Sequence, residues 1–478
     1  MAFYTIRYHS WYNTISNGHL VCVLLLILVE VKLMENKGKL VGLLMESSRT
    51  ALREKLDNMN SVDIAADLED LEEQDAVKVF RILSKEKAAD VFAYLDPDIQ
   101  QNIIAAIADR EIGGIINELF LDDAVDFIEE MPANVVKRVL ANVTPGRREL
   151  INHFLQYPED SAGSIMTIEY VDLKSHMTVA DAFARIRSTG MNKETIYTCY
   201  VTDSARRLIG LVTARTLLLS PKESSIKDVM EPNVVYAKTH DDQEGLINSF
   251  RKYGCLAMPV VDSEDRLVGI VTYDDALTVQ EEEATEDLEK MAAMLPSEEP
   301  YLKTNVFTMA KNRILWLVLL NLSVFLTGAI VSGFEEMLAI LPALVAFMPL
   351  LMDTSGDAGS QSSTLIIRGM ALDEIAMSDA MRILFKELRV SLICGGVLAI
   401  VNCARVMIFG YDFATAVTVS IALLVAIIMS KTAGGLLPLG AKLIKLDPAV
   451  MAGPVLTTIV DAASLIVYFN LARIIMHI

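Results

Sequence analysis

The sequence predicts a multidomain membrane protein of the α plus α/β class, with an acidic soluble part followed by a helical membrane part. Charge is segregated: of 62 acidic and 42 basic residues, 11 of each lie in 311–478, so the formal net charge of −20 arises in 1–310. Hydropathy follows the same division, because 314–334 contains 21 consecutive uncharged residues. A repeat offset by 59 residues predicts two copies of a small α/β domain in the soluble part.

The membrane part is expected to contain five spanning helices. About 20 apolar residues in a helix cross a hydrocarbon layer of roughly 30 Å. The uncharged or nearly uncharged runs are 314–334, 337–352, 390–411, 413–430 and 448–475. Lysine and arginine gather before the first run, between the second and third, and between the fourth and fifth. By the positive-inside rule we expect residues 34–310 in the cytoplasm and the C-terminus outside, with the inner (cytoplasmic) membrane as the location.

Residues 1–33 differ in character from both parts. Nine apolar residues at 21–29 follow a polar lead, as in a signal peptide, but no small-residue cleavage site follows them. A highly charged stretch begins at Met34, which we expect to be the working start, with 1–33 an upstream extension. A sixth span in 1–33 would reverse the predicted orientation.

The soluble part is predicted to begin with an acidic helical domain over 47–160. Apolar residues recur there at helical spacing in short blocks, which are separated by Asp96-Pro97, Met131-Pro132 and Thr144-Pro145. Short helices in this rhythm are typical of a superhelix.

Two α/β copies are expected next, over 161–224 and 225–280. Arg207-Leu-Ile-Gly-Leu-Val-Thr213 recurs as Arg266-Leu-Val-Gly-Ile-Val-Thr272, and each copy combines a helix with strands. An acidic linker helix over 281–310 then leads to the membrane domain, 311–478.

The acidity argues against nucleic acid as a partner, because phosphate binding requires clustered lysine and arginine. It favours divalent cations as partners, or simple solubility. Five scattered cysteines and six dispersed histidines predict neither a disulfide framework nor a zinc site. The chain has no P-loop and no nucleophile elbow, so we do not expect an enzyme.

The linker helix places like charges side by side. Asp275, Glu282, Glu286 and Glu289 share one side of it, with Glu283 and Asp287 close by. A bound divalent cation would relieve this repulsion, since hard cations take oxygen ligands. The alternative is a solvated charged face.

Asp461 lies near the middle of the last apolar run, where an ionised side chain costs roughly 3 kcal/mol. Thr457 and Gly453 fall on the same helical face and form a narrow stripe that suits a pore or close helix packing. The alternative is a structural aspartate paired with Lys431, at the end of the fourth run.

Glycine, serine and aspartate are concentrated in 349–369, where we expect the second membrane helix to break. Together with Asp447-Pro-Ala-Val and Thr457-Thr-Ile-Val-Asp461, this segment resembles the MgtE family of magnesium channels. The α/β pair resembles tandem CBS domains, and the acidic helical domain fits the same family. The resemblance covers 47–475.

The resemblance implies a homodimer in the lipid bilayer, with one pore in which Asp461 meets hydrated Mg²⁺ and Thr457 and Thr458 lie nearby. It also implies closure by cytosolic Mg²⁺ bound between the N domain, the CBS pair and the linker or plug helix. The implied regulatory positions are Asp242, Glu244, Asp275, Glu283, Glu286, Asp287, Asp122, Asp123 and Asp126.

The CBS resemblance implies one site for an adenine nucleotide such as ATP. Thr272 and Asp275 match the family's G-h-h-T-x-x-D motif, whereas the first copy has Thr216 in place of the aspartate. The alternative is that Thr272 ends a strand and Asp275 caps the next helix.

Among the positions that depart from the family pattern, Asp357 and Lys431 are, with Gly453, candidates for pore lining or selectivity. Asp357 replaces an expected asparagine, and Lys431 stands where a small or neutral residue is expected. The lysine could pair with Asp461 or Asp357, or repel a divalent cation. The sequence thus predicts gated Mg²⁺ transport. The alternatives are a membrane-anchored sensor of divalent cations or nucleotide that does not conduct, and a transporter of Co²⁺ or Mn²⁺.

Overall fold

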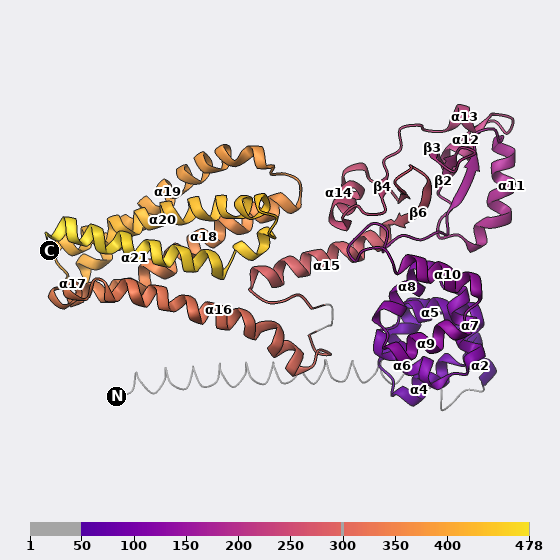
Figure 1. Ribbon diagram of the computed structural model, residues 1–478, viewed down its shortest axis with the longest axis horizontal. Helices are drawn as coiled ribbons and strands as arrows, with labels where there is room; N and C mark the ends of the chain where they lie inside the picture. Colours follow the sequence, from indigo (N-terminus) through magenta and orange to yellow (C-terminus); the bar gives the residue numbers. More distant parts are fainter. Residues whose placement is uncertain (1–48, 298–300, 478) are drawn as a thin grey trace, which may run out of the picture. The chain divides into compact units, whose positions relative to one another are not determined.

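The structure is a computed structural model that describes residues 49–297 and 301–477 (Figure 1). These residues form two compact units. The first contains the described residues up to Leu246 together with Tyr253–Asp275, and the second contains Ile247–Lys252 and the chain from Ala276 onward. The predictions for 1–33, including Met34 as the working start, lie outside the described residues.

The acidic N-terminal domain is helical, as predicted. Between Arg49 and Phe154 its helices are α2 (Arg49–Asp57), α3 (Ser61–Glu69), α4 (Glu73–Phe80), α5 (Lys85–Ala93), α6 (Pro97–Ala106), α7 (Asp109–Glu118), α8 (Leu121–Glu130), α9 (Ala133–Asn142) and α10 (Pro145–Phe154). Helices α3, α5, α7 and α9 pack in succession, as in a superhelix. All three predicted turns separate helices, and Pro97 and Pro145 open α6 and α10, where a missing N–H is tolerated.

Two equivalent sheets follow, which confirms the predicted repeat. The first copy contains β1 (Val171–Lys174), α11 (Val179–Thr189), β2 (Thr198–Thr202), β3 (Leu208–Thr213) and α12 (Ala214–Leu219). The second contains α13 (Ile226–Val229), β4 (Ala237–Lys238), α14 (Gln243–Tyr253), β5 (Ala257–Val261) and β6 (Leu267–Thr272). In each sheet the first strand is parallel and the third antiparallel to the middle strand, with the register Thr198↔Thr213 repeated as Ala257↔Thr272.

In each copy a glycine of the third strand packs against a methionine, and the two methionines occupy equivalent positions in the repeat. A Cβ on Gly210 would lie 2.8 Å from Met230 Sδ, and one on Gly269 would lie 2.6 Å from Met166 Sδ. Both distances are below any ordinary contact, so these strands require glycine. The reciprocal contacts join the two copies into one body.

The linker helix α15 (Tyr273–Met291) begins and ends earlier than the predicted 281–310. Ala293 adopts a positive φ of 53°, directly after the helix. The next helix begins only at Val306. The acidic segment is therefore continuous with the second CBS copy.

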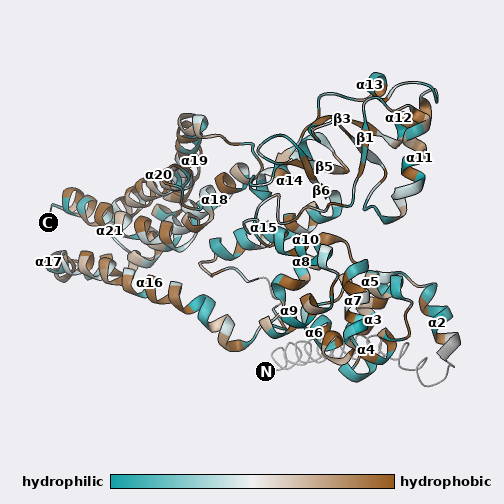
Figure 2. Ribbon diagram, turned by 45° about the vertical axis from the view of Figure 1, so that its right-hand side comes forward, coloured by the Kyte–Doolittle hydropathy of each residue, from teal (hydrophilic) through white to brown (hydrophobic). Residues whose placement is uncertain are grey.

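The second unit contains α16 (Val306–Ser332), α17 (Glu335–Ile340), the 3₁₀ segment η2 (Pro342–Phe347), α18 (Met348–Ala371), η3 (Met377–Asp379), α19 (Ala380–Ile408), α20 (Phe413–Leu443), η4 (Pro448–Met451) and α21 (Pro454–Met476). Within the described residues, four segments are long and apolar enough to cross a membrane: Val306–Ser332, Met377–Ile408, Phe413–Leu443 and Pro448–Met476. Figure 2 shows hydrophobic residues concentrated along these helices.

The prediction for the second span was wrong in two respects. Residues 337–352 are no single helix, because Pro342 starts the 3₁₀ segment η2 and α18 begins at Met348. The segment rich in glycine, serine and aspartate is also not broken: α18 is helical for 24 residues, about 36 Å at 1.5 Å per residue. It packs against α20 and α21, where small residues allow close approach, so tertiary contacts override weak helix propensity.

Helix α20 approaches α18 most closely at Gly434. A Cβ on Gly434 would lie 2.3 Å from the carbonyl oxygen of Gly359, whereas one on Gly440, also in α20, has no neighbour within 4 Å. We expect Gly434→Ala to destabilise the protein by about 1–3 kcal/mol, the usual range for overpacking. Gly440→Ala should leave stability unchanged or raised. Thermal unfolding in detergent checks this, and equal midpoints for the two variants would contradict the close contact.

Candidate functional site

One acidic side chain of α18 and one of α21 lie near each other in the membrane unit. Asp461, on α21, lies close enough to Asp353, on α18, for their charges to interact. The helices touch nearby, because a Cβ on Gly356 would lie 3.4 Å from Thr457 Cγ2. Asp353 was missed in the sequence because only helix packing brings it to Asp461.

One face of α18 is polar and exposed. Its residues, spaced three or four apart, form what we call the α18 polar stripe: Asp353, Asp357, Gln361, Thr364 and Arg368. Charged groups facing lipid are costly, so in a bilayer this stripe requires water or a protein surface opposite it.

Hydrogen bonds fix the opposite face of α18. Ser430 Oγ donates to the carbonyl oxygen of Ser355, and Ser464 Oγ donates to Ser355 Oγ over 3.0 Å. Ser355 is fully buried. These contacts with α20 and α21 determine which side of α18 faces outward, and hence where the stripe lies.

The predicted pore hydroxyls lie at the start of α21. Thr457 Oγ1 and Thr458 Oγ1 donate to the carbonyl oxygen of Pro454 over 3.1 and 2.8 Å, and Thr458 Oγ1 is 3.2 Å from Ser323 Oγ. Each hydroxyl oxygen therefore remains able to accept a hydrogen bond from water.

Gly453 precedes α21 and does not continue its face. A Cβ there would lie 2.4 Å from the carbonyl oxygen of Met291, the last residue of α15. Its small size is thus required by the linker helix rather than by a helical stripe with Thr457.

Lys431 is buried on α20 and points to α18. Its Nζ donates to the carbonyl oxygen of Ala358 (3.3 Å), Gln361 Oε1 (3.4 Å) and Ser362 Oγ (3.4 Å). Among the residues that the structure describes, it forms no ion pair with Asp461 or Asp357. Both pairings considered for this lysine are therefore absent from the described contacts.

The end of α15 is joined to the segment before α21. Lys290 Nζ lies 2.6 Å from Asp447 Oδ2 and 2.5 Å from Glu286 Oε1. Burial raises the pKa of Asp287, and the charge of Asp447 raises it further. Met291 packs against Ile367, Ala449 and Ala452. Glu286 and Asp287 are thus at this junction, and Glu283 lies one turn earlier on α15. Lys290 and Asp447 were not among the predicted site residues.

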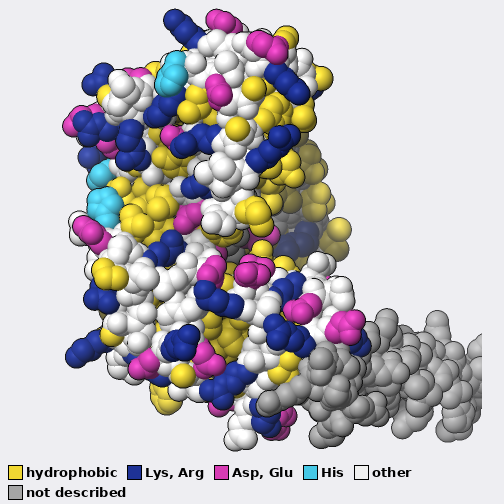
Figure 3. All heavy atoms as spheres, turned by 90° about the vertical axis from the view of Figure 1, so that its right-hand side faces the viewer, with side chains coloured by type: hydrophobic (Ala, Val, Ile, Leu, Met, Phe, Trp, Pro, Cys, Tyr) yellow, Lys and Arg dark blue, Asp and Glu magenta, His cyan; other side chains and the backbone are white. Residues whose placement is uncertain are grey.

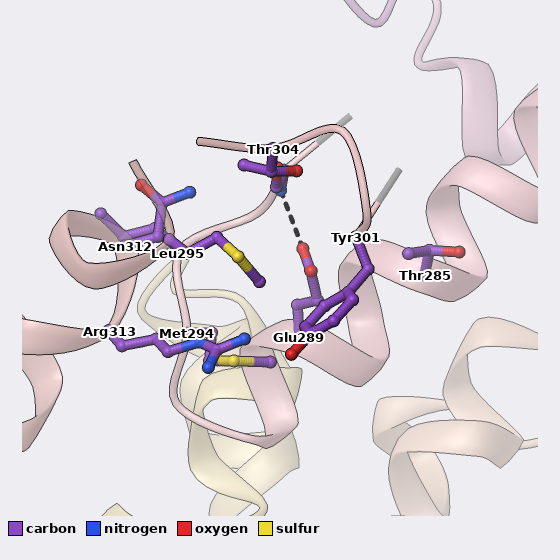
Figure 4. A pocket seen from close by; sticks show the side chains of 10 residues that line it. Thr285, Glu289, Met294, Leu295, Tyr301, Thr304, Asn312 and Arg313 are labelled. Atoms are coloured by element: carbon purple, nitrogen blue, oxygen red, sulfur yellow. Dashed lines mark hydrogen bonds between the residues drawn. The ribbon is translucent and has the colours of Figure 1, made fainter. Parts of the chain in front are cut away.

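A pocket of about 320 Å³ lies beside this junction (Figure 4). Glu289, Tyr301, Thr304 and Arg313 are among its lining residues. Glu289 Oε2 accepts a hydrogen bond of 2.8 Å from the backbone N–H of Ser297. The Glu289 carboxylate is therefore already engaged in holding the turn that follows α15.

A second acidic assembly lies in the first unit, where α8 meets the CBS pair. We call it the α8 acid cluster: Asp122, Asp123, Glu169, Glu194 and Asp275. One cation balances it, because Arg147 Nη1 lies 3.2 Å from Glu169 Oε1 and both side chains are largely buried. On the face drawn in Figure 3, acidic and basic side chains are instead interspersed.

Burial and mutual repulsion raise the pKa values in this cluster. The pKa of Asp123 rises to about 6 and that of Glu194 to about 8, in both cases first by burial and then by the charge of Asp275. Burial holds the pKa of Asp122 well above its usual range, with Asp123 and Asp275 adding to the shift. Burial also raises the pKa of Asp275, against a hydrogen bond from Thr272.

The cluster has unused acceptors. Asp122 is only 8 % exposed, and its Oδ1, like Glu194 Oε2, is buried without a hydrogen-bond partner. Within the described residues, however, no group of three or more His, Cys, Asp or Glu side chains is arranged to hold a metal ion. A cation bound at the α8 acid cluster would therefore draw the carboxylates closer together.

The remaining predicted regulatory acids are Asp126, Asp242 and Glu244. Asp126, one turn beyond Asp122 on α8, interacts with the cluster, because burial and then the charges of Asp123, Glu129 and Asp275 raise its pKa to about 8. Asp242 Oδ1 accepts a hydrogen bond of 2.9 Å from the backbone N–H of Glu244, at the start of α14. Glu169 and Glu194 were missed because they lie in loops before β1 and β2, and only the fold brings them to α8.

Thr272 and Asp275, predicted for nucleotide binding, contact each other. Thr272 Oγ1 donates to Asp275 Oδ2 at the start of α15. This is the strand-end and helix-cap arrangement considered as the alternative. In the first copy Thr213 Oγ1 is 2.9 Å from Thr216 Oγ1, at the start of α12.

Family models match the N-terminal helical domain, both α/β copies and most of the membrane domain. A profile for divalent cation transporters, MgtE, matches residues 348–471, one for the MgtE intracellular N domain matches 59–160, and one for CBS domains matches 162–222 and 226–282. These matches agree with the resemblance predicted from the sequence.

Comparison with individual proteins leads to the same family. The chain is 34% identical over 438 residues to magnesium transporter MgtE of Thermus thermophilus, covering 91% of this chain and 97% of that protein. It is 29% identical to magnesium transporter MgtE of Bacillus subtilis, over 92% of this chain and 97% of that protein. The crystal structure of the soluble part of a magnesium transporter covers 52% of this chain and 99% of its own, with 28% identity and a TM-score of 0.50. The chain therefore belongs to the MgtE family of divalent cation transporters.

Proposed function

We propose that this chain conducts Mg²⁺ across the inner (cytoplasmic) membrane as a homodimeric channel, along a path lined by the α18 polar stripe and Asp461. The observation that carries this proposal is the Asp353 and Asp461 pair beside an exposed polar face, in a unit whose long helices are otherwise apolar. A second copy opposite the stripe would shield it from lipid and double the number of carboxylates. The orientation, with 34–310 in the cytoplasm and the C-terminus outside, stays a prediction.

The donor set suits Mg²⁺. This ion dehydrates reluctantly and is usually held through one or two carboxylates while it retains several waters. Asp353 and Asp461 supply carboxylates, and the Thr457 and Thr458 oxygens accept from a hydration shell. Because these donors are all oxygens, they suit hard cations such as Mg²⁺, and by the same chemistry Mn²⁺.

The junction of α15 with the segment before α21 supports control of the path. Lys290 bridges Glu286 to Asp447, and the Met291 carbonyl abuts Gly453, two turns before Asp461. A shift of α15 would therefore move the start of α21. Mg²⁺ bound among Glu283, Glu286 and Asp287 would relieve their repulsion. It would favour the closed state only to the extent that it binds the closed state more tightly than the open state.

The α8 acid cluster is the second proposed regulatory site. It joins α8, two loops of the first CBS copy and the start of α15, so a cation there would hold these elements together. Asp126 lies at its edge, and Asp242 and Glu244 remain separate candidates. An adenine nucleotide such as ATP would have to displace the hydrogen bond between Thr272 and Asp275.

Asp461→Ala tests the conduction path. We expect Mg²⁺ uptake into proteoliposomes to fall at least tenfold, because the ion would lose a central carboxylate. Asp379→Asn is the matched control, since Asp379 precedes α19 and pairs with Arg382. Uptake that survives Asp461→Ala, or a wild-type chain that binds Mg²⁺ without transport, would contradict the proposal and favour a sensor.

Neutralising the linker acids tests the gate. In the triple variant Glu283→Gln, Glu286→Gln, Asp287→Asn, we expect uptake to continue at internal Mg²⁺ concentrations that silence the wild type. The reason is that the repulsion relieved by Mg²⁺ would already be absent. Uptake measured at increasing internal Mg²⁺ decides this, and unchanged inhibition in the triple variant would exclude these acids from gating.

The α8 acid cluster should make stability depend on pH. The folded-state pKa values of Asp123, about 6, and Glu194, about 8, exceed the unfolded values of about 4. Stability linked to these protons is complete below about pH 4 and is lost as pH rises through 6 and 8. In EDTA we therefore expect the thermal midpoint to fall between pH 5 and 8, and Mg²⁺ to restore it.

Glu194→Gln should reduce both the fall with pH and the Mg²⁺ effect, since it removes one buried negative charge. Glu149→Gln, at an exposed position on α10, is the control with the same charge change. Thermal unfolding of the detergent-solubilised protein provides the measurement. A wild-type thermal midpoint that stays constant from pH 5 to 8 would show that repulsion within the cluster does not destabilise the folded protein.

A further inference from the structure

Lys431 is a buried cation whose described hydrogen-bond acceptors are all uncharged. It is 5 % exposed, and its three acceptors all belong to α18: the Ala358 carbonyl oxygen, Gln361 Oε1 and Ser362 Oγ. An ammonium group has three N–H donors, so these contacts use its full capacity. They do not cancel its charge, and a charge buried within a membrane protein is costly unless another charge or backbone carbonyls stabilise it.

The partner lies one hydrogen bond further, on α19. Ser362 Oγ donates to Glu387 Oε2 over 2.7 Å, so the serine accepts from Lys431 and donates to Glu387. Ser362 is itself 2 % exposed. The three residues form a continuous chain, with a positive charge at one end and a negative charge at the other.

Helix α20 is shaped to hold this chain. A Cβ on Gly435 would lie 3.1 Å from Glu387 Cγ, so the glycine leaves room for the glutamate stem. Gly434 does the same for the α18 backbone at Gly359. One turn of α20 thus contains the lysine and the two glycines that leave room for its partners on α18 and α19.

The chain also touches the α18 polar stripe. Gln361 accepts from Lys431 and is a member of the stripe, one turn from Asp357. Any net charge on Lys431 and Glu387 therefore acts on an ion in the proposed path through a single intervening side chain.

We propose that Lys431 and Glu387, bridged by Ser362, are one charge-compensated unit that sets the electrostatic potential along the α18 polar stripe and so the affinity of the path for a divalent cation. This makes Glu387 a specificity-determining residue, and the inference rests on the proposed conduction path. The unit keeps a lysine beside a cation path without repelling the cation, because the paired glutamate cancels its charge.

The magnitude is large enough to measure. Two unit charges about 10 Å apart interact by roughly 332/(ε·r) in kcal/mol, and a divalent ion doubles the effect. At an effective dielectric constant of about 40, between the values for a protein site and for water, this corresponds to roughly a tenfold change in apparent affinity for each uncompensated charge. Whether the affinity rises or falls depends on which of the two charged residues is removed.

The test is the KM for Mg²⁺ uptake into proteoliposomes at low internal Mg²⁺, for Glu387→Gln, Lys431→Met and the double variant. Glu387→Gln leaves an uncompensated positive charge and should raise KM about tenfold. Lys431→Met leaves a negative charge and should lower KM by a similar factor. The double variant should lie within about twofold of wild type. Glu374→Gln and Lys442→Met, at exposed positions, make the same charge changes as controls.

A purely structural role gives a different pattern. Both single variants would then lose maximal rate together, KM would not move in opposite directions, and the inference would be overturned. If a single variant fails to fold in a thermal unfolding assay, the double variant decides: a folded protein with wild-type KM supports the unit, and a misfolded one overturns it. Asp461→Ala is run in parallel, so loss of the conduction path itself is recognised separately.

Discussion

The close contact between α18 and α20 determines most of what the membrane unit can do. Gly434 lies against the Gly359 carbonyl with no room for a side chain, and Ser430 bonds to Ser355 beside it. This contact sets the rotation of α18 about its axis. Rotation in turn decides that Asp353 and Asp357 face outward while Ser362 faces Lys431. A polar helix is stable here because its small residues pack closely and its charged residues share one face.

The two acidic assemblies have surroundings that suit the different tasks proposed for them. Asp353 lies on the exposed α18 polar stripe with half-buried Asp461 near it, and in the proposed path a hydrated ion would pass there without losing all of its water. The α8 acid cluster is buried, and its pKa values are raised by burial and repulsion. Repulsion in a buried site is relieved by binding a cation or protons, so such a site responds to concentration and suits regulation rather than passage.

The linker helix connects these tasks through its two ends. Asp275 at its start belongs to the α8 acid cluster, and Lys290 near its end is bonded to Asp447. From the sequence, the helix is a row of repelling acids. The structure adds a lysine that binds Glu286 and Asp447 together, and a glycine at 453 that lets the helix end approach α21. The repulsion is therefore partly balanced where the helix meets the membrane unit.

The sequence by itself determined the fold class, the repeated α/β domain, the helical N-terminal domain and the family, and it predicts a pore role for Asp461. These features depend on local periodicity, on repetition and on a charge within an apolar run, all of which are visible along the chain. Only the tertiary structure decided that α18 is continuous, that Asp353 lies near Asp461, that Glu194 joins Asp122, and that Lys431 is linked to Glu387. Each of these depends on which residues distant in sequence become neighbours, because helix propensity and hydropathy describe a segment without the helices against which it packs.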